Sequence, residues 1–204
     1  PTKYGIAAIS FLYYSAGIID SLDSAGNAVS VRAEKDILLA ASWSYKLKKY
    51  TGGINLKYLR STLAETATAN AFACDLGAKY YGLNNIVLGA SVQNLGTKLK
   101  YISKADMLPI TFRAGGSYNA SEILNLPITG YLDVVKILYD SKFKESLGVE
   151  YAIDVNILLR GGYEFGYDSS GLSFGFGYSF EDIVLDYSFS AMKIVDNTHK
   201  VSLS

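Results

Sequence analysis

The segment that decides the fold class of this chain is Leu172-Ser173-Phe174-Gly175-Phe176-Gly177-Tyr178-Ser179. Large apolar side chains alternate in it with glycine and serine. Because successive side chains of a β-strand point to opposite faces, this alternation predicts a strand with one apolar face and one small, polar face. No helical period competes with this pattern over any long span of the chain.

The same alternation recurs along most of the chain, in blocks of about ten residues separated by turn residues. In one block, for example, Ile54, Leu56 and Tyr58 oppose Asn55 and Lys57. We count on the order of twelve such segments. They are the stretches 4–14, 35–47, 54–58, 72–80, 86–93, 110–118, 126–136, 146–151, 156–165, 172–179, 182–189 and 200–203.

The composition disfavours several classes of protein. Half of the 204 residues are hydrophobic, and 19 acidic residues balance 19 lysines and arginines, so the net charge is zero. Nucleic-acid binders and polybasic membrane-surface proteins rely on excess positive charge. The apolar stretches are far shorter than the roughly 18 residues that a membrane-spanning helix needs. Because the chain opens Pro-Thr-Lys-Tyr, without a basic and then apolar segment, we interpret it as a processed or partial chain.

Alternating strands also build soluble β-sandwiches, and the polar face distinguishes the two possibilities. In a sandwich that face meets water and is rich in Lys, Glu and Thr. Here it is dominated by Gly, Ser, Ala and Asn, with roughly one charge in the middle of each strand. We therefore predict an all-β protein, an antiparallel transmembrane β-barrel in a bacterial outer membrane, with residues 1–204 forming a single barrel domain.

Aromatic side chains near the strand ends support a membrane location. Tyrosine and tryptophan prefer the interface between lipid and water, where an apolar ring and a polar tip are both satisfied. The predicted membrane-interface aromatics, all on the apolar face, are Trp43, Tyr45, Tyr118, Tyr151, Tyr163 and Tyr178.

Charges of both signs are predicted to face the barrel lumen. By parity, these lumen-facing positions are Lys57, Asp75, Lys79, Arg113, Asp133, Glu150, Arg160, Glu164 and Asp186. Unpaired charges are costly in a restricted interior, so we expect cross-strand pairs and networks among them. A pore selective for one sign of ion would carry a biased ring instead. The balance favours a closed, plugged or gated lumen over an open general pore.

The sequence offers little support for catalysis. His199 is the only histidine, and its parity places it on the apolar face, away from the polar partners that a catalytic histidine needs. Cys74 is the only cysteine, so neither an intrachain disulfide nor a cysteine-based metal site can form. Carboxylates such as Asp133 and Glu150 are better interpreted as ion-pair partners than as an acid and base. We predict a non-enzymatic protein without cofactor or metal.

Several motifs resemble the PorV/PorQ family of FadL-like outer-membrane barrels. They are Val92-Gln93-Asn94-Leu95-Gly96, Leu108-Pro109-Ile110-Thr111-Phe112-Arg113-Ala114-Gly115, Asp186-Tyr187-Ser188-Phe189 and the closing stretch 197–204. The resemblance implies about twelve strands of a barrel of about fourteen, with an N-terminal segment that plugs the lumen. The family's N-terminal region and first strands have no counterpart before Pro1, and Ser204 stops before the usual terminal aromatic residue. We therefore expect that the hatch, the first strands and the extreme C-terminus are missing, and that a missing segment or another subunit closes the barrel.

The resemblance implies two possible functions. PorV-like members act with type IX secretion as a scaffold or shuttle, whereas other FadL-like members transport hydrophobic small molecules. The apolar lumen positions are few, which favours the secretion hypothesis; they are Leu38, Leu59, Tyr131, Leu158 and Val184. Expected partners are outer-membrane lipid and proteins of a secretion or surface assembly, with no nucleic acid and no ligand that we can name. Recognition is expected on the loops at 20–32, 61–68, 96–107, 138–143 and 190–198.

Overall fold

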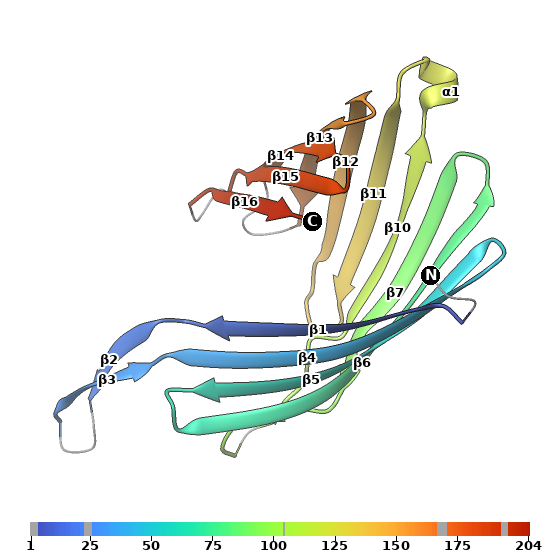
Figure 1. The fold of residues 1–204 in the computed structure, drawn as a ribbon. Coiled ribbons are helices and arrows are strands. Elements are labelled where there is room, and N and C mark those ends of the chain that lie inside the picture. Colours follow the sequence, from blue (N-terminus) through green and yellow to red (C-terminus); the bar gives the residue numbers. More distant parts are fainter. Residues whose placement is uncertain (1–3, 23–25, 104, 167–170, 193–195) are drawn as a thin grey trace. The chain divides into compact units, whose positions relative to one another are not determined.

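The computed structural model describes residues 4–22, 26–103, 105–166, 171–192 and 196–204. Nearly all regular structure is β, and the main sheet is antiparallel with 12 strands in the order β1-β4-β5-β6-β7-β10-β11-β12-β13-β14-β15-β16 (Figure 1). The predicted number of about twelve segments is therefore confirmed. The strands are β1 (Ile6–Ser15), β4 (Glu34–Leu47), β5 (Tyr50–Leu63), β6 (Ala67–Leu83), β7 (Ile86–Gly96), β10 (Thr111–Asn119), β11 (Ile128–Ile137), β12 (Phe143–Asp154), β13 (Ile157–Phe165), β14 (Leu172–Phe180), β15 (Ile183–Ser190) and β16 (Thr198–Leu203).

Three small elements lie in the connections between these strands. A hairpin of β2 (Ile18–Leu22) and β3 (Ala28–Arg32) separates β1 from β4. A second hairpin, of β8 (Leu99–Lys100) and β9 (Ala105–Asp106), lies between β7 and β10. A short helix, α1 (Ser121–Leu124), joins β10 to β11. No helix in the described part of the chain is long and apolar enough to cross a membrane.

The chain divides into two compact units, which we describe separately. Unit 1 comprises Pro1–Ala78 and Ser91–Ile110, and unit 2 comprises Lys79–Ala90 and Thr111–Ser204. The boundary passes through β6 and β7, so each unit contains part of that hairpin.

Tight two-residue turns join the strands at one edge of each unit. In unit 1, Lys48 takes a positive φ of 53° between β4 and β5. In unit 2, Asn85 and Glu181 do the same with φ of 60° and 51°. Positive φ at such positions matches the twist of the flanking strands. The opposite edge carries most of the longer connections, but one predicted loop there is wrong: β5 and β6 run through most of 61–68, leaving only a turn at 64–66.

Strand register gives each unit one polar and one apolar face. In unit 1, Ser42 lies opposite Asn55 and Ala40 opposite Lys57, and these residues define its polar face. In unit 2, the residues of one face include Glu150, Arg160 and Gly175, which are aligned across β12, β13 and β14. The parity predicted from the sequence therefore matches the register at these positions.

The large apolar side chains of the other face are exposed instead of forming a core. Phe11 and Leu56 in unit 1, and Leu147 and Phe174 in unit 2, are all solvent-exposed. Buried side chains are few in the described part of the chain, and half of them are alanines. A soluble sandwich would bury its apolar faces between two packed sheets. This exposed apolar surface is what a lipid-facing sheet requires.

Candidate functional site: two polar clusters on the sheet

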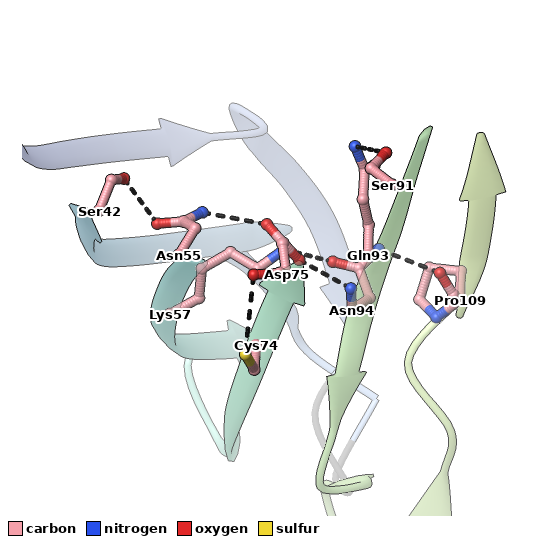
Figure 2. Close-up of polar contacts among 9 residues, drawn as sticks. All are labelled: Ser42, Asn55, Lys57, Cys74, Asp75, Ser91, Gln93, Asn94 and Pro109. Carbon is pink, nitrogen blue, oxygen red and sulfur yellow. Dashed lines mark hydrogen bonds and ion pairs between the residues drawn. The ribbon is translucent and has the colours of Figure 1, made fainter. Parts of the chain in front are cut away.

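Unit 1 contains a hydrogen-bonded cluster on its polar face, shown in Figure 2. We call it the amide cluster and define it as Ser42, Asn55, Lys57, Asp75 and Asn94. Lys57 Nζ lies 2.6 Å from Asp75 Oδ1, and both side chains are largely buried. Asn55 donates to Asp75 Oδ2 at 3.0 Å and accepts from Ser42 at 2.9 Å. The cluster therefore links β4, β5, β6 and β7.

Asn94 lies near the end of β7, and its backbone N–H contacts the cluster. Its φ is 61°, a left-handed conformation that asparagine tolerates better than most residues. Its backbone N–H donates to Asp75 Oδ1 at 2.8 Å, and its side-chain oxygen accepts from Lys57 Nζ at 2.5 Å. Its side-chain nitrogen donates to the Pro109 carbonyl at 3.0 Å (Figure 2). Asn94 thus joins the ion pair to the segment that follows β7.

Unit 2 contains a second cluster, built around one arginine. We call it the arginine cluster and define it as Tyr131, Glu150, Arg160 and Asp186. Arg160 Nε donates to Glu150 Oε2 at 2.9 Å, and its Nη1 donates to Asp186 Oδ1 at 2.5 Å. Tyr131 donates to the other Glu150 oxygen at 3.4 Å. The contacts run from β11 to β15.

Glycines allow the arginine to reach Asp186 across β14. Gly175 lies opposite Arg160, and Gly177 lies opposite Asp186 in the strand register. A Cβ on Gly177 would stand 2.9 Å from Asp186 Oδ1 and 3.3 Å from Arg160 Nη1. Any larger side chain at this position would therefore compete with the ion pair for the same space. The alternating glycines of the segment 172–179 therefore leave space on this face for the long side chain of Arg160.

The clusters contain five of the nine charged positions predicted to face the lumen. These are Lys57, Asp75, Glu150, Arg160 and Asp186. The other four form no ion pair among the described residues; they are Lys79, Arg113, Asp133 and Glu164. That all nine face a lumen stays a prediction.

Sequence reasoning did not identify the amide side chains or Tyr131 as members of these clusters. Asn55 was recognised as a residue of the polar face, but its bridging position between Ser42 and Asp75 depends on strand register. Asn94 lies just beyond the predicted strand 86–93, and no pattern indicates its positive φ. Tyr131 was counted as an apolar lumen residue, yet its hydroxyl donates to Glu150. A polar residue directly after an alternating block was the only available signal.

The predicted interface aromatics lie on the apolar faces, and most are near the edge with tight turns. Trp43 and Tyr45 stack at a centroid distance of 6.1 Å near the end of β4. Tyr118, Tyr151 and Tyr178 lie close to the corresponding ends of β10, β12 and β14. Tyr163 lies toward the opposite edge, where its ring meets Phe165 edge-on at 4.5 Å. Their role at a lipid interface stays a prediction.

The remaining candidate residues are placed away from the polar clusters. His199 Nδ1 lies 2.8 Å from the Tyr187 hydroxyl, and its ring lies 5.2 Å from that of Phe189. The Cys74 thiol donates a weak hydrogen bond to the Asp75 carbonyl, at 3.7 Å. No group of three or more potential metal-ligating side chains occurs in the described ranges.

The two clusters leave little net charge on the polar faces. The amide cluster pairs one cation with one carboxylate, and the arginine cluster holds one cation between two carboxylates. The amide cluster is therefore neutral and the arginine cluster keeps one net negative charge, so the paired groups create no strong field of one sign. Such a surface suits an uncharged solute better than an ion.

The chain has the fold of known hydrocarbon transporters. The crystal structure of the Pseudomonas putida toluene transporter TodX superposes with a TM-score of 0.62 at 15% identity, over 96% of this chain and 76% of that one. A second TodX structure gives 0.60 at 14% identity, over 89% and 71% of the two chains. A structure described as the CymD monoaromatic hydrocarbon channel gives 0.56 at 13%, over 97% and 84%. No protein-family model matches the chain, and no curated protein matches its sequence.

These similarities confirm the predicted fold class, an all-β antiparallel barrel of the FadL-like type. They do not confirm the narrower PorV/PorQ assignment.

Proposed function

We propose that this chain forms an outer-membrane β-barrel that passes small hydrophobic molecules, of the monoaromatic hydrocarbon class, across a bacterial outer membrane. The observation that carries the proposal is the shared fold with TodX and CymD over most of their length. The proposal involves no enzymatic activity and no cofactor. The apolar faces of the barrel would contact lipid, and its polar faces would line the passage.

A row of leucines on the polar face of unit 1 supports this proposal. Leu12 lies opposite Leu38, and Leu38 lies opposite Leu59, across β1, β4 and β5. Aliphatic side chains placed side by side on an otherwise polar face offer a hydrocarbon a surface on which to desolvate. Leu38 and Leu59, which the sequence predicts to face the lumen, are neighbours in this row, and Leu12 extends the row to β1.

The secretion hypothesis is the second candidate, and the structural similarities favour transport over it. The secretion hypothesis is supported by the motifs that resemble PorV/PorQ proteins and by the small number of predicted apolar lumen positions. A secretion scaffold would need specific protein contacts on the connections between strands. A transporter needs a continuous passage for its solute, so the two hypotheses predict different effects for the same substitution.

Uptake of radiolabelled toluene by Escherichia coli cells that express the protein tests the transport proposal. We expect uptake above that of cells carrying an empty vector, and we expect Leu38→Asn to lower it several-fold by interrupting the leucine row. Ala8→Asn is the matched control, because Ala8 lies on the same face opposite Ser42, outside that row. Uptake equal to that of the vector control, from protein that is folded in the outer membrane, would refute the proposal.

A further inference from the structure

The most buried residues of unit 1 lie on its polar face. Ser61 and Ala69 are 2% exposed, and Ala71 is 1% exposed. Ala69 and Ala71 share the strand parity of Asp75, and Ser61 shares that of Lys57. Small side chains on a sheet cannot shield one another from solvent, because neighbouring Cβ atoms are about 5 Å apart. Another part of the chain must therefore cover this patch.

The connection between β7 and β10 is positioned to provide that cover. We call its described residues, 97–103 and 105–110, the strap. The Tyr101 hydroxyl donates to Ser61 Oγ at 2.8 Å, which joins the strap to the middle of the buried patch. Leu108, near the other end of the strap, is itself buried. The loop predicted at 96–107 as a free recognition surface is thus held against the sheet at Tyr101.

A second attachment joins the strap to the amide cluster. Pro109 accepts a hydrogen bond from the Asn94 side chain, which the Lys57–Asp75 ion pair holds in place (Figure 2).

The carboxylate of Asp36, which lies opposite Ser61 in the strand register, also indicates that the patch is covered. Its Oδ1 is buried and has no hydrogen-bond partner among the described residues. A carboxylate oxygen on an open face would be solvated instead.

We infer that the strap narrows the passage along the polar face and sets the upper size limit of the solutes that pass. This inference rests on the proposed transport function. The strap acts as a steric filter whose position depends on two attachments, Tyr101 to Ser61 and Asn94 to Pro109. Each is a single neutral hydrogen bond, so substitution of one partner would release part of the strap. Tyr101 thereby becomes a determinant of specificity.

Cysteine labelling tests the position of the strap without any transport assay. The reporter is Ala69→Cys in a Cys74→Ser background, because Cys74 is the only native cysteine. A water-soluble maleimide should label this site slowly, and Tyr101→Ala should accelerate labelling about tenfold by removing one attachment and the ring. Ile102→Ala is the matched control: Ile102 is adjacent in the strap but 82% exposed, and its removal should change nothing.

Two further reporters keep this test falsifiable. Ala71→Cys repeats the measurement in case a thiol at position 69 disturbs the patch. Ser10→Cys, on the polar face of β1 and already exposed, should be labelled rapidly in every background. Rapid labelling of positions 69 and 71 in the presence of Tyr101 would overturn the inference, as would equal acceleration by Ile102→Ala.

Uptake of two solutes of different size tests whether the strap limits transport. In the uptake assay, Tyr101→Ala should admit a bulkier aromatic such as naphthalene relative to toluene, and Ile102→Ala should leave the ratio unchanged. An unchanged ratio with measurable toluene uptake refutes the filter alone. If neither hydrocarbon enters through any variant, the transport proposal fails and the size filter fails with it; the labelling result then still decides whether the strap covers the patch.

Discussion

The amide cluster and the arginine cluster stabilise half-buried carboxylates in different ways. In the amide cluster, Asp75 receives hydrogen bonds from Lys57, from Asn55 and from the backbone of Asn94. In the arginine cluster, one guanidinium serves both Glu150 and Asp186. The first arrangement distributes donors over three residues of two strands, β5 and β7, whereas the second concentrates them on one side chain.

Because of this difference, burial and donor count rank the two cations in opposite order by their expected contribution to the free energy of unfolding. The Lys57 side chain is 15% exposed and the Arg160 side chain 39%. By burial, loss of Lys57 should cost more free energy of unfolding. By donor count, loss of Arg160 should cost more, because two carboxylates lose their cation at once. The predictions below separate these two expectations.

The largest effect is expected from closing the path of the arginine across β14. Gly177→Leu places side-chain atoms where Arg160 meets Asp186, so we expect a loss of about 3 kcal/mol in the free energy of unfolding. Gly148→Ala is the control on the same face, since its Cβ would lie 3.6 Å from Tyr131 Cβ, an ordinary contact. Urea titration in detergent micelles, followed by Trp43 fluorescence, measures both. Equal losses would contradict the need for a glycine beneath the ion pair.

The next effect compares the two cations directly. Arg160→Met should cost about 2 kcal/mol and Lys57→Met about 1 kcal/mol, because Asp75 keeps its amide donors when Lys57 is removed. Adding Glu150→Gln and Asp186→Asn to Arg160→Met should recover part of the loss. The same urea titration decides the order, and a larger loss from Lys57→Met would restore burial as the dominant factor.

A smaller effect is expected from the backbone of Asn94. Both Asn94→Ala and Asn94→Gly remove the side-chain bonds to Lys57 and Pro109, but only alanine is strained at a φ of 61°. Asn94→Ala should therefore be less stable than Asn94→Gly by about 1 kcal/mol. Unfolding curves of the two variants, measured under the same conditions, give the free-energy cost of the left-handed conformation for alanine. Identical stabilities would mean that β7 loses the left-handed conformation once the side chain is absent.

The smallest effect is expected outside both clusters, at the connection between β11 and β12. The pKa of Asp140 is lowered, first because the Lys142 backbone N–H donates to its carboxylate and also because of nearby lysines. A lowered carboxyl pKa stabilises the fold above the unfolded pKa, and the contribution is lost as the pH falls through the folded pKa. Asp140→Asn should therefore be slightly less stable than the native chain at neutral pH and equal to it in acid. Unfolding curves at pH 7 and pH 3 test this sign; a difference that grows in acid would contradict it.

Period-two alternation predicted the strands and their faces because it depends on one local rule, the opposite directions of successive side chains. That rule placed Lys57 with Asp75 and Glu150 with Arg160 on shared faces before any register was known. It could not predict that Arg160 reaches Asp186, because that contact spans two strand neighbours and depends on the glycine between them. It also assigned 61–68 to a loop, because polar residues continue through a tight hairpin there.

The non-local parts of the candidate site were beyond local patterns. The positive φ of Asn94 is set by the Asp75 carboxylate that receives its N–H, a contact between different strands. The position of Tyr101 is set by Ser61, forty residues away in the chain. Parity placed Leu38 and Leu59 on the polar face, but the sequence pattern did not show that Leu12, Leu38 and Leu59 form a row. Those facts follow from register, which alternation alone leaves undetermined.

The different lengths of connection at the two edges have a consequence for how such a chain can change over evolutionary time. At one edge, two-residue turns with left-handed residues such as Lys48 and Glu181 leave no room for insertions, because one added residue would shift the pairing of both flanking strands. At the other edge, the β2–β3 hairpin shows that whole elements can be accommodated between paired strands. Divergence in length should therefore accumulate at the longer connections, which lie mostly at that edge and include the α1 connection at the other, and these are where a foreign peptide could be inserted with the sheet intact.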